Sequence, residues 1–86
     1  MFALKVYPNP MSFRGTIEFT TMESGLTSIE LYTLRGERVE VFMNENTDEF
    51  MPIRIDIDTH KYRKGMYILY IRNGSNVYKE KITIVN

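Results

Sequence analysis

The chain has 86 residues, no cysteine, one histidine and equal numbers of acidic and basic side chains, 11 of each. This length fits a single domain, since domains most often have roughly 100–150 residues. The lack of cysteine excludes disulfides, thiolate metal ligands and cysteine nucleophiles. The zero net charge excludes general electrostatic binding of nucleic acid, but not a local basic patch.

Apolar and polar residues alternate with a period of two through most of the chain, in short runs rich in Ile, Val, Tyr, Phe and Thr. This pattern predicts β-strands at residues 3–7, 15–21, 26–33, 37–43, 51–58, 66–73 and 76–85. No stretch has the periodicity of a long helix, and one helical turn is expected near residues 58–62. Seven strands separated by turns indicate an all-β sandwich or small barrel.

The segments between strands contain strong turn signals. Pro8 and Pro10 fix their own φ angles and push the preceding residues toward extended backbone, so residues 7–10 are expected to separate the first strand from the second. Gly36 and the Asn73-Gly74 pair each predict a tight hairpin, and the second of these makes the last two strands antiparallel. Residues 44–49 are expected to form an acidic loop at a hairpin tip.

The first and last strands are expected to lie at sheet edges, where an exposed strand is able to pair with another copy of the chain. Lys79 and Lys81 on the last strand would discourage such pairing. The oligomeric state is left open by these observations.

The most metal-like stretch contains Asp56, Asp58 and His60. The two aspartates lie on the same face of a predicted strand, but a calcium site needs six to eight oxygens and no loop supplies the rest. A solvent-facing strand is therefore favoured over a metal site. His60 as a general base lacks a recognisable nucleophile motif and is expected to be a surface turn residue. We therefore expect no metal, no cofactor and no enzymatic activity.

Two further charged clusters each allow either a binding role or a solvent-exposed turn. Glu45, Asp48 and Glu49 either bind a cation or form a solvated loop, and the solvated loop is favoured. Residues 61–64 combine Lys61, Arg63 and Lys64 with a tyrosine, an arrangement able to bind nucleic acid. A basic turn is favoured there, and contact with a negatively charged partner surface is a second option.

Tyrosine is abundant, with six residues in 86. Tyr67 is expected in the core, whereas Tyr70, Tyr78 and Met66 are assigned to an outer face. Such a face would suit a partner, or a carbohydrate stacked on Tyr70 and Tyr78, although the absence of tryptophan counts against a sugar platform.

Four motifs, in order along the chain, resemble those of one known family. They are Tyr7-Pro8-Asn9-Pro10 at the start, Ile29-Glu30-Leu31-Tyr32 followed by Gly36 and Val39, Gly65-Met66-Tyr67, and a last strand containing Lys81. The series is similar to the type A C-terminal sorting domain of proteins that the type IX (Por) secretion system of Bacteroidetes exports. The resemblance covers essentially the whole chain.

The resemblance implies an immunoglobulin-like antiparallel sandwich of about seven strands that serves as a non-catalytic sorting signal. It directs an attached N-terminal cargo to the cell surface or medium, after transit through the periplasm. Implied partners are the export machinery of the outer membrane and a sortase-like peptidase, with no nucleic acid and no membrane span. The implied signal residues are Pro8, Asn9, Pro10, Gly36, Gly65, Tyr67 and Lys81.

Three positions depart from the family pattern. Thr33 stands where an Asp is usual, Glu37 replaces a basic residue, and Tyr62 replaces a Leu three positions before Gly65. These changes keep turn and core character but weaken any expectation of charge-dependent recognition. The N-terminus has no signal-peptide features, so residues 1–86 are interpreted as a single domain excised from a larger secreted protein. The alternatives are an accessory adhesion or carbohydrate-binding sandwich and a structural spacer domain.

Overall fold

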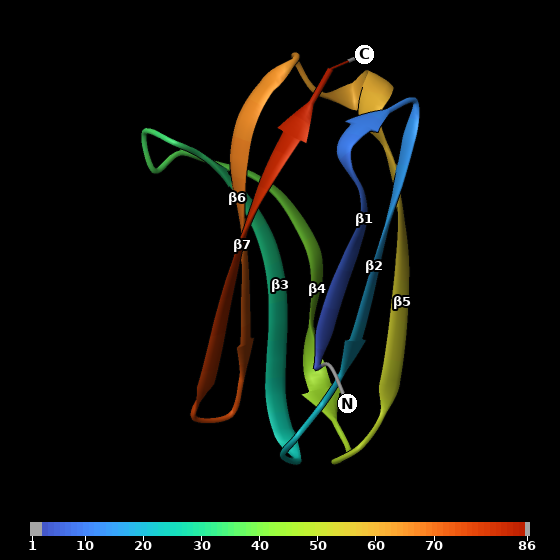
Figure 1. The fold of residues 1–86 in the computed structure, drawn as a ribbon. Helices are drawn as coiled ribbons and strands as arrows, with labels where there is room; N and C mark the ends of the chain where they lie inside the picture. The colour runs from blue at the N-terminus through green and yellow to red at the C-terminus, as the bar shows by residue number, and fades with distance from the viewer. Residues whose placement is uncertain (1–2, 86) are drawn as a thin grey trace.

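A computed structural model describes residues 3–85 and confirms the all-β fold (Figure 1). The elements are β1 (Leu4–Ser12), β2 (Arg14–Thr20), β3 (Gly25–Thr33), β4 (Arg38–Thr47), β5 (Pro52–Asp58), η1 (Thr59–Lys61), β6 (Gly65–Asn73) and β7 (Asn76–Ile84). The short 3-10 helix η1 is the helical turn expected near residues 58–62. Most strand boundaries lie within one residue of the prediction, because the alternation of side chains sets them directly.

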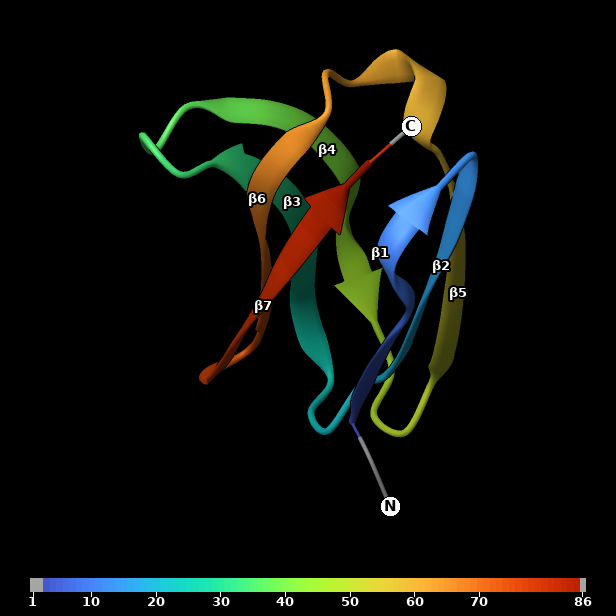
Figure 2. The same cartoon turned by 45° about the horizontal axis from the view of Figure 1, so that its top comes forward.

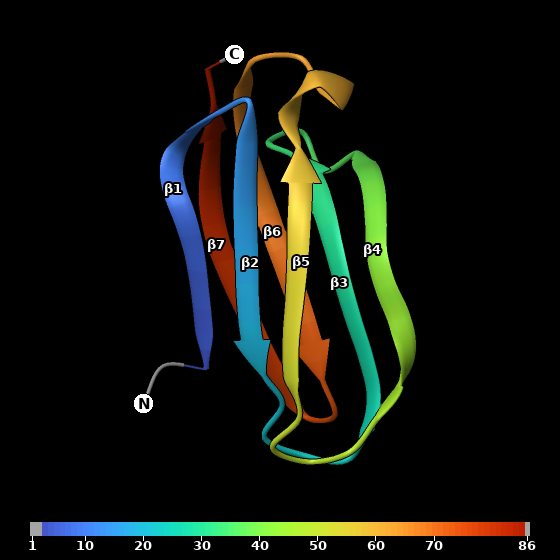
Figure 3. The same cartoon turned by 90° about the vertical axis from the view of Figure 1, so that its right-hand side faces the viewer.

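The strands form two layers, as Figure 3 shows from the side. One layer contains β1, β2 and β5, and the other contains β4, β3, β6 and β7 in that order. Neighbours within each layer are antiparallel, which confirms the predicted immunoglobulin-like sandwich. A parallel pairing between Met11 of β1 and Ile84 of β7 joins the two layers into one continuous strand order.

The core lies between the layers and consists of the inward-facing residues of the strands. Its members are Met11, Ile17, Phe19, Ile29, Leu31, Ile57, Tyr67, Leu69, Ile71, Ile82 and Ile84. Within β2, β3 and β6 these residues alternate with more exposed ones, as a strand with one buried face requires. Their burial is the main stabilising contribution in a domain this small.

Two strands extend further than the sequence predicted. The prolines do not end β1, which continues to Ser12, and the chain turns instead at Phe13, whose φ is 71°. Both peptide bonds preceding Pro8 and Pro10 are cis. The expected acidic hairpin tip at residues 44–49 is also wrong, because residues up to Thr47 belong to β4 and pair with β3.

The prediction that the first and last strands are sheet edges is wrong where these strands pair with each other, at Met11 and Ile84, but holds for the first half of β7. In the continuous strand order, the outer positions belong to β4 and β5, while β1 and β7 are neighbours. The two strands meet only near the end of β7 and diverge toward its beginning, as Figure 2 shows. β6 pairs with the last strand along its whole length, whereas the edge that faces β1 is paired at one end only.

Candidate functional site

The β6–β7 hairpin brings together three of the seven predicted signal residues. Gly65 pairs with Ile84, and Tyr67 pairs with Ile82, so both lie beside the end of the last strand. Lys81 directly precedes Ile82 in β7, and its side chain lies on the exposed face of the strand. The hairpin turns at Gly74, where φ is 59°, as the Asn-Gly signal predicted.

Tyr67 is a core residue, as predicted, with 6% of its surface exposed. Its hydroxyl donates a hydrogen bond to the carbonyl oxygen of Arg63, and its ring meets that of Tyr62 edge-on, 6.3 Å away between centroids. The hydroxyl of Tyr62 in turn donates to a Glu40 carboxylate oxygen at 2.7 Å. Burial, followed by this hydrogen bond, raises the pKa of Tyr62. The two tyrosines thus fasten the segment before β6 onto the sandwich.

Gly65 does not serve to admit a neighbouring group close to the backbone. A Cβ added there would meet no atom within 4 Å, among the residues that the structure describes. The backbone requires glycine instead, because φ is 151°, a value that side-chain-bearing residues rarely adopt. Gly36 has the same kind of requirement, with φ of 88° in the β3–β4 hairpin.

Asn9 explains why the Pro8-Asn9-Pro10 motif lies against the last strand. Its side-chain nitrogen donates to the carbonyl oxygen of Lys81 at 2.8 Å, and its side-chain oxygen accepts from the backbone N–H of Thr83 at 3.1 Å. The backbone continues this ladder, since Val85 donates its N–H to the carbonyl of Met11 at 2.9 Å. The side-chain amide therefore acts as one peptide group of a parallel ladder between β1 and β7.

A second asparagine anchors the opposite end of the hairpin. Asn73 is fully buried, and its oxygen accepts from the backbone N–H groups of Met22 and Glu23 at 2.8 and 3.1 Å. Its nitrogen donates to the carbonyl of Glu23 and to the hydroxyl of Thr27, each at 3.0 Å. The sequence pattern predicted only that Asn73 is a turn residue. Its buried hydrogen bonds were not predictable, because they join residues 46 to 51 positions apart in the chain.

Glu23 adds hydrogen bonds at the same end of the β6–β7 hairpin, to the residues that follow its turn. Its carboxylate accepts from the Ser75 hydroxyl and backbone N–H and from the Asn76 side chain. The hydrogen bonds from Ser75 are the largest cause of the lowered pKa of Glu23. The β6–β7 hairpin is consequently fastened near both ends, by Asn9 at one and by Asn73 with Glu23 at the other.

The outer face of the four-stranded layer combines tyrosines with cations. Tyr32 and Tyr70 meet edge-on at 6.2 Å, and Arg72 and Lys79 each lie 5.6 Å from the centroid of the Tyr70 ring. These residues border a hollow of about 800 Å³ that Lys81 and Gly36 also line. Gly36 is otherwise separate from the other predicted signal residues, in the β3–β4 hairpin.

Tyr78 was predicted on this outer face, and this is wrong. Its side chain is on the inward side of β7, where it packs against the core and meets Phe19 edge-on at 5.2 Å. Tyr70 and Met66 are on the outer face as predicted, with Met66 exposed. Because Tyr70 already carries Arg72 and Lys79 beside its ring, the face offers a cationic surface rather than a bare stacking platform.

The charged clusters form no site of their own. Asp58 accepts hydrogen bonds from the backbone N–H of His60 and contacts its ring nitrogen, each at 3.0 Å, and these bonds lower the pKa of Asp58. Over residues 3–85, no group of three or more His, Asp or Glu side chains is placed to hold a metal ion. Lys61, Arg63 and Lys64 are exposed on the connection between β5 and β6.

Within the described part of the chain, no helix is long and apolar enough to span a membrane. A family model described as a secretion system C-terminal sorting domain matches residues 5–85. No curated protein matches the chain. The match includes all seven predicted signal residues, from Pro8 to Lys81, and all seven strands apart from the first residue of β1.

Proposed function

Because this chain belongs to the family of secretion system C-terminal sorting domains, we propose that its β6–β7 hairpin, held in place by β1, carries the sorting signal. The domain itself is a C-terminal sorting signal for type IX secretion, which directs an attached cargo to the cell surface or medium. It acts with the type IX machinery and with that cargo.

We assign the signal to two groups of residues. Gly65, Tyr67 and Lys81 belong to the hairpin that the export machinery would contact, while Pro8, Asn9 and Pro10 hold the end of β7 in position. The hydrogen bonds between Asn9 and the backbone of β7 are the observation that carries this assignment. Gly36 acts separately, by shaping the β3–β4 hairpin beside the outer hollow.

The domain acts by being recognised and not by catalysis. The family is not known as catalytic. Its single histidine, His60, is engaged by Asp58 in a surface turn, with no nucleophile motif in the sequence. We propose that residues 1–86 are the tail of a larger secreted protein, that the tail crosses the periplasm with its cargo, and that a sortase-like peptidase then removes it.

A carbohydrate-binding role is less well supported than sorting. Only one of the two tyrosines proposed to stack on sugars lies on the outer face, since Tyr78 packs inward against Phe19. The other, Tyr70, has cations beside its ring. The sorting family also accounts for residues 5–85, whereas no observation requires a sugar ligand.

Deletion of residues 76–86 from a full-length cargo tests the proposal. We expect the truncated cargo to remain in the periplasm, and normal surface display of the truncated cargo would contradict the assignment. Two point variants separate signal from stability. Lys81→Ala leaves the backbone carbonyl that Asn9 binds, and Tyr67→Phe removes only the hydroxyl bonded to Arg63. If Lys81 is part of the signal, Lys81→Ala reduces export without lowering the unfolding temperature.

A further inference from the structure

Among the residues that the structure describes, none pairs with one edge of the first half of β7. Within residues 3–85, β7 pairs on the β1 side only at Ile84. The side chain of Asn9 extends this pairing back to Lys81. Figures 1 and 2 show β1 and β7 separating from this point toward the beginning of β7. An uncovered edge inside an otherwise continuous strand order is unusual, because it presents unpaired backbone groups.

The hydrogen-bond register identifies the backbone groups at this edge. The Asn9 side chain binds the carbonyl of Lys81 and the N–H of Thr83, so odd-numbered residues of β7 direct their backbone groups away from β6. Successive residues of a strand alternate in this respect. The N–H and C=O groups of Val77 and Lys79, and the N–H of Lys81, therefore face the open edge.

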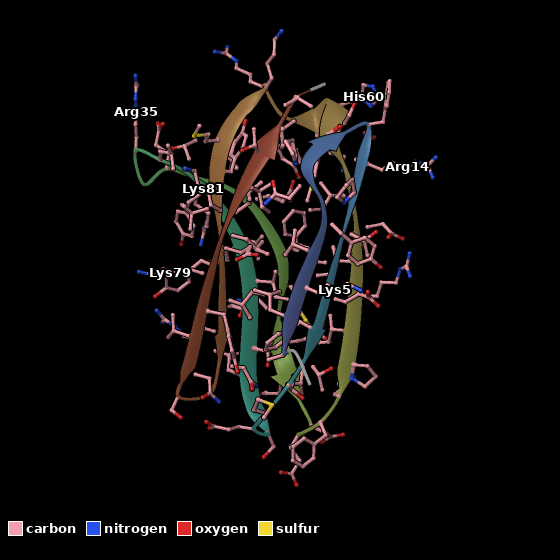
Figure 4. The ribbon with its side chains drawn as sticks, in the orientation of Figure 1. Lys5, Arg14, Arg35, His60, Lys79 and Lys81 are labelled. Carbon is pink, nitrogen blue, oxygen red and sulfur yellow. The ribbon has the colours of Figure 1, made fainter. Side chains whose placement is uncertain are left out.

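The side chains along this edge differ in character on its two faces. On the outer face, Lys79 and Lys81 are exposed and lie on the side of β7 away from β1, as Figure 4 shows. Lys79 shares the ring of Tyr70 with Arg72. Two acids line the hollow beside these cations: Glu30, which already accepts hydrogen bonds from Tyr32 and Arg38, and Glu80, which lies between the two lysines in the chain. Arg72, Lys79 and Lys81 outnumber these two acids, so the lining of the hollow carries a net positive charge.

The inner face of the edge is apolar apart from one exposed acid, Glu80. Leu4, Val6 and Tyr78 pack against the core there but are only partly buried. A further strand beside β7 would cover them with its own inward side chains. An added strand thus gains main-chain hydrogen bonds, apolar contacts on one face and contacts with lysines on the other.

We propose that the open edge of β7 at Val77, Lys79 and Lys81 is a strand-addition site for an extended peptide segment with alternating acidic and apolar side chains. In such an interaction, main-chain hydrogen bonds supply affinity and the alternating side chains supply specificity. The proposal rests on the sorting role for its partner, which would be an extended segment of the export machinery.

Charge disfavours a second copy of the chain as the occupant. Antiparallel pairing of two β7 edges centred on residue 80 would place Lys79 of each copy opposite Lys81 of the other, and pairing centred on residue 79 would place the two Lys79 side chains opposite each other. Like charges directly opposite each other on neighbouring strands are destabilising. Acidic residues at the same positions would form favourable cross-strand pairs instead, so charge complementarity selects an acidic partner.

Binding is tested with the 86-residue chain and a blocked synthetic octapeptide of alternating valine and aspartate. We expect the peptide to shift the NMR amide signals of Val77, Lys79 and Lys81 and to slow their exchange with solvent. A matched peptide with lysine in place of aspartate should not do so. Shifts confined to other elements, or equal binding of the two peptides, would overturn the proposal.

Charge reversal provides a variant that leaves the backbone intact. The double variant Lys79→Glu/Lys81→Glu should bind the aspartate peptide about tenfold more weakly, because two cross-strand pairs become repulsive. A control double variant, Lys61→Glu/Lys64→Glu, changes the net charge equally at an exposed turn and should bind as the unaltered chain does. Equal weakening of peptide binding by both variants would show that net charge alone causes the effect, and this would overturn the proposal.

Val77→Pro removes an N–H group at the open edge and should abolish the peptide-induced shifts. If this variant does not fold, judged by circular dichroism, the charge-reversal variant decides the question alone. Amide shifts that depend on protein concentration without peptide, at these same residues, would show that a second copy occupies the edge.

The export assay separates this inference from the sorting role. The chain is fused to a reporter that carries its own signal peptide, with and without the two double variants. Export of the unaltered and control fusions, together with periplasmic retention of Lys79→Glu/Lys81→Glu, is expected. Export of all three would overturn the edge proposal and leave sorting intact, whereas failure of the unaltered fusion would contradict sorting itself.

Discussion

Replacing Asn9 by alanine removes the side-chain amide that joins β1 to β7. Two hydrogen bonds are lost, one to the carbonyl of Lys81 and one from the N–H of Thr83. A typical hydrogen bond contributes about 0.5–1.5 kcal/mol net. Both bonds here are exposed, so water replaces part of each interaction. We therefore expect a loss of about 1–2 kcal/mol in the free energy of unfolding.

In a domain of this size, 1 kcal/mol corresponds to a change of about 4–8 °C in unfolding temperature. The expected decrease for Asn9→Ala is therefore roughly 4–16 °C. Thermal unfolding followed by circular dichroism measures this change. Hydrogen exchange adds a local readout, since the N–H groups of Thr83 and Val85 should exchange faster once β1 separates from β7.

Asn46→Ala is the matched control, because this exposed asparagine lies on β4, at the far edge of the sandwich. Its unfolding temperature should stay close to that of the unaltered chain. If Asn9→Ala unfolds at the same temperature as Asn46→Ala, and Thr83 keeps its slow exchange, the proposed ladder between Asn9 and β7 does not stabilise the fold. The assignment of Pro8, Asn9 and Pro10 to positioning the last strand would then be refuted.

Three further predictions concern stability. Leu69→Ala, at a residue with no exposed surface, should cost about 2–5 kcal/mol in urea unfolding, because it leaves a cavity between the layers; a cost below 1 kcal/mol would place Leu69 outside a packed core. Gly36→Ala should cost about 1–2 kcal/mol, because φ at this hairpin position is 88°. A Gly36→Ala chain as stable as the unaltered one would disprove that requirement. Glu23, whose pKa is lowered in the folded state, stabilises the fold above its ordinary pKa of 4.5, and this contribution is lost as the pH falls through the lowered value. Glu23→Gln should therefore make the unfolding temperature less dependent on pH below 4.5, and an unchanged pH profile would contradict the bonds from Ser75 and Asn76.

The sequence predicted the strands and hairpins because their signals are local. Alternation at period two located β2, β3, β5 and β6 to within about one residue, and the Asn73-Gly74 pair identified the last hairpin. The inward position of Tyr67 followed from the same alternation. The family resemblance added the immunoglobulin-like arrangement, which the strand pairing confirms.

The errors arose where distant segments meet. Pro8 and Pro10 suggested that β1 ends early, but the Asn9 side chain supplies hydrogen bonds to β7 that allow the strand to continue. Residues 44–47 are polar on both faces, so local pattern gave no strand signal, and pairing with β3 decides their conformation. The error at Tyr78 was of another kind, because alternation with Ile82 and Ile84 already places this residue on the inward face of β7, where it meets Phe19.

The candidate site was predictable only as a set of residues. Family motifs named the seven signal positions, but nothing in the sequence indicated that Asn9 contacts the backbone of Lys81, 72 residues away. Nor did it indicate that Asn73 is a buried junction with four hydrogen bonds or that part of the β7 edge is open. These features are products of tertiary packing, which a single sequence does not display.

The sorting role is tested most directly by localisation of a reporter. Residues 1–86 are fused to the C-terminus of a fluorescent protein that carries a signal peptide, and expressed in a Bacteroidetes strain with the type IX system and in a mutant lacking its translocon. We expect the reporter on the surface or in the medium of the first strain only. Periplasmic retention in both strains, or equal export from both, would contradict the assignment of this domain as a type IX sorting signal.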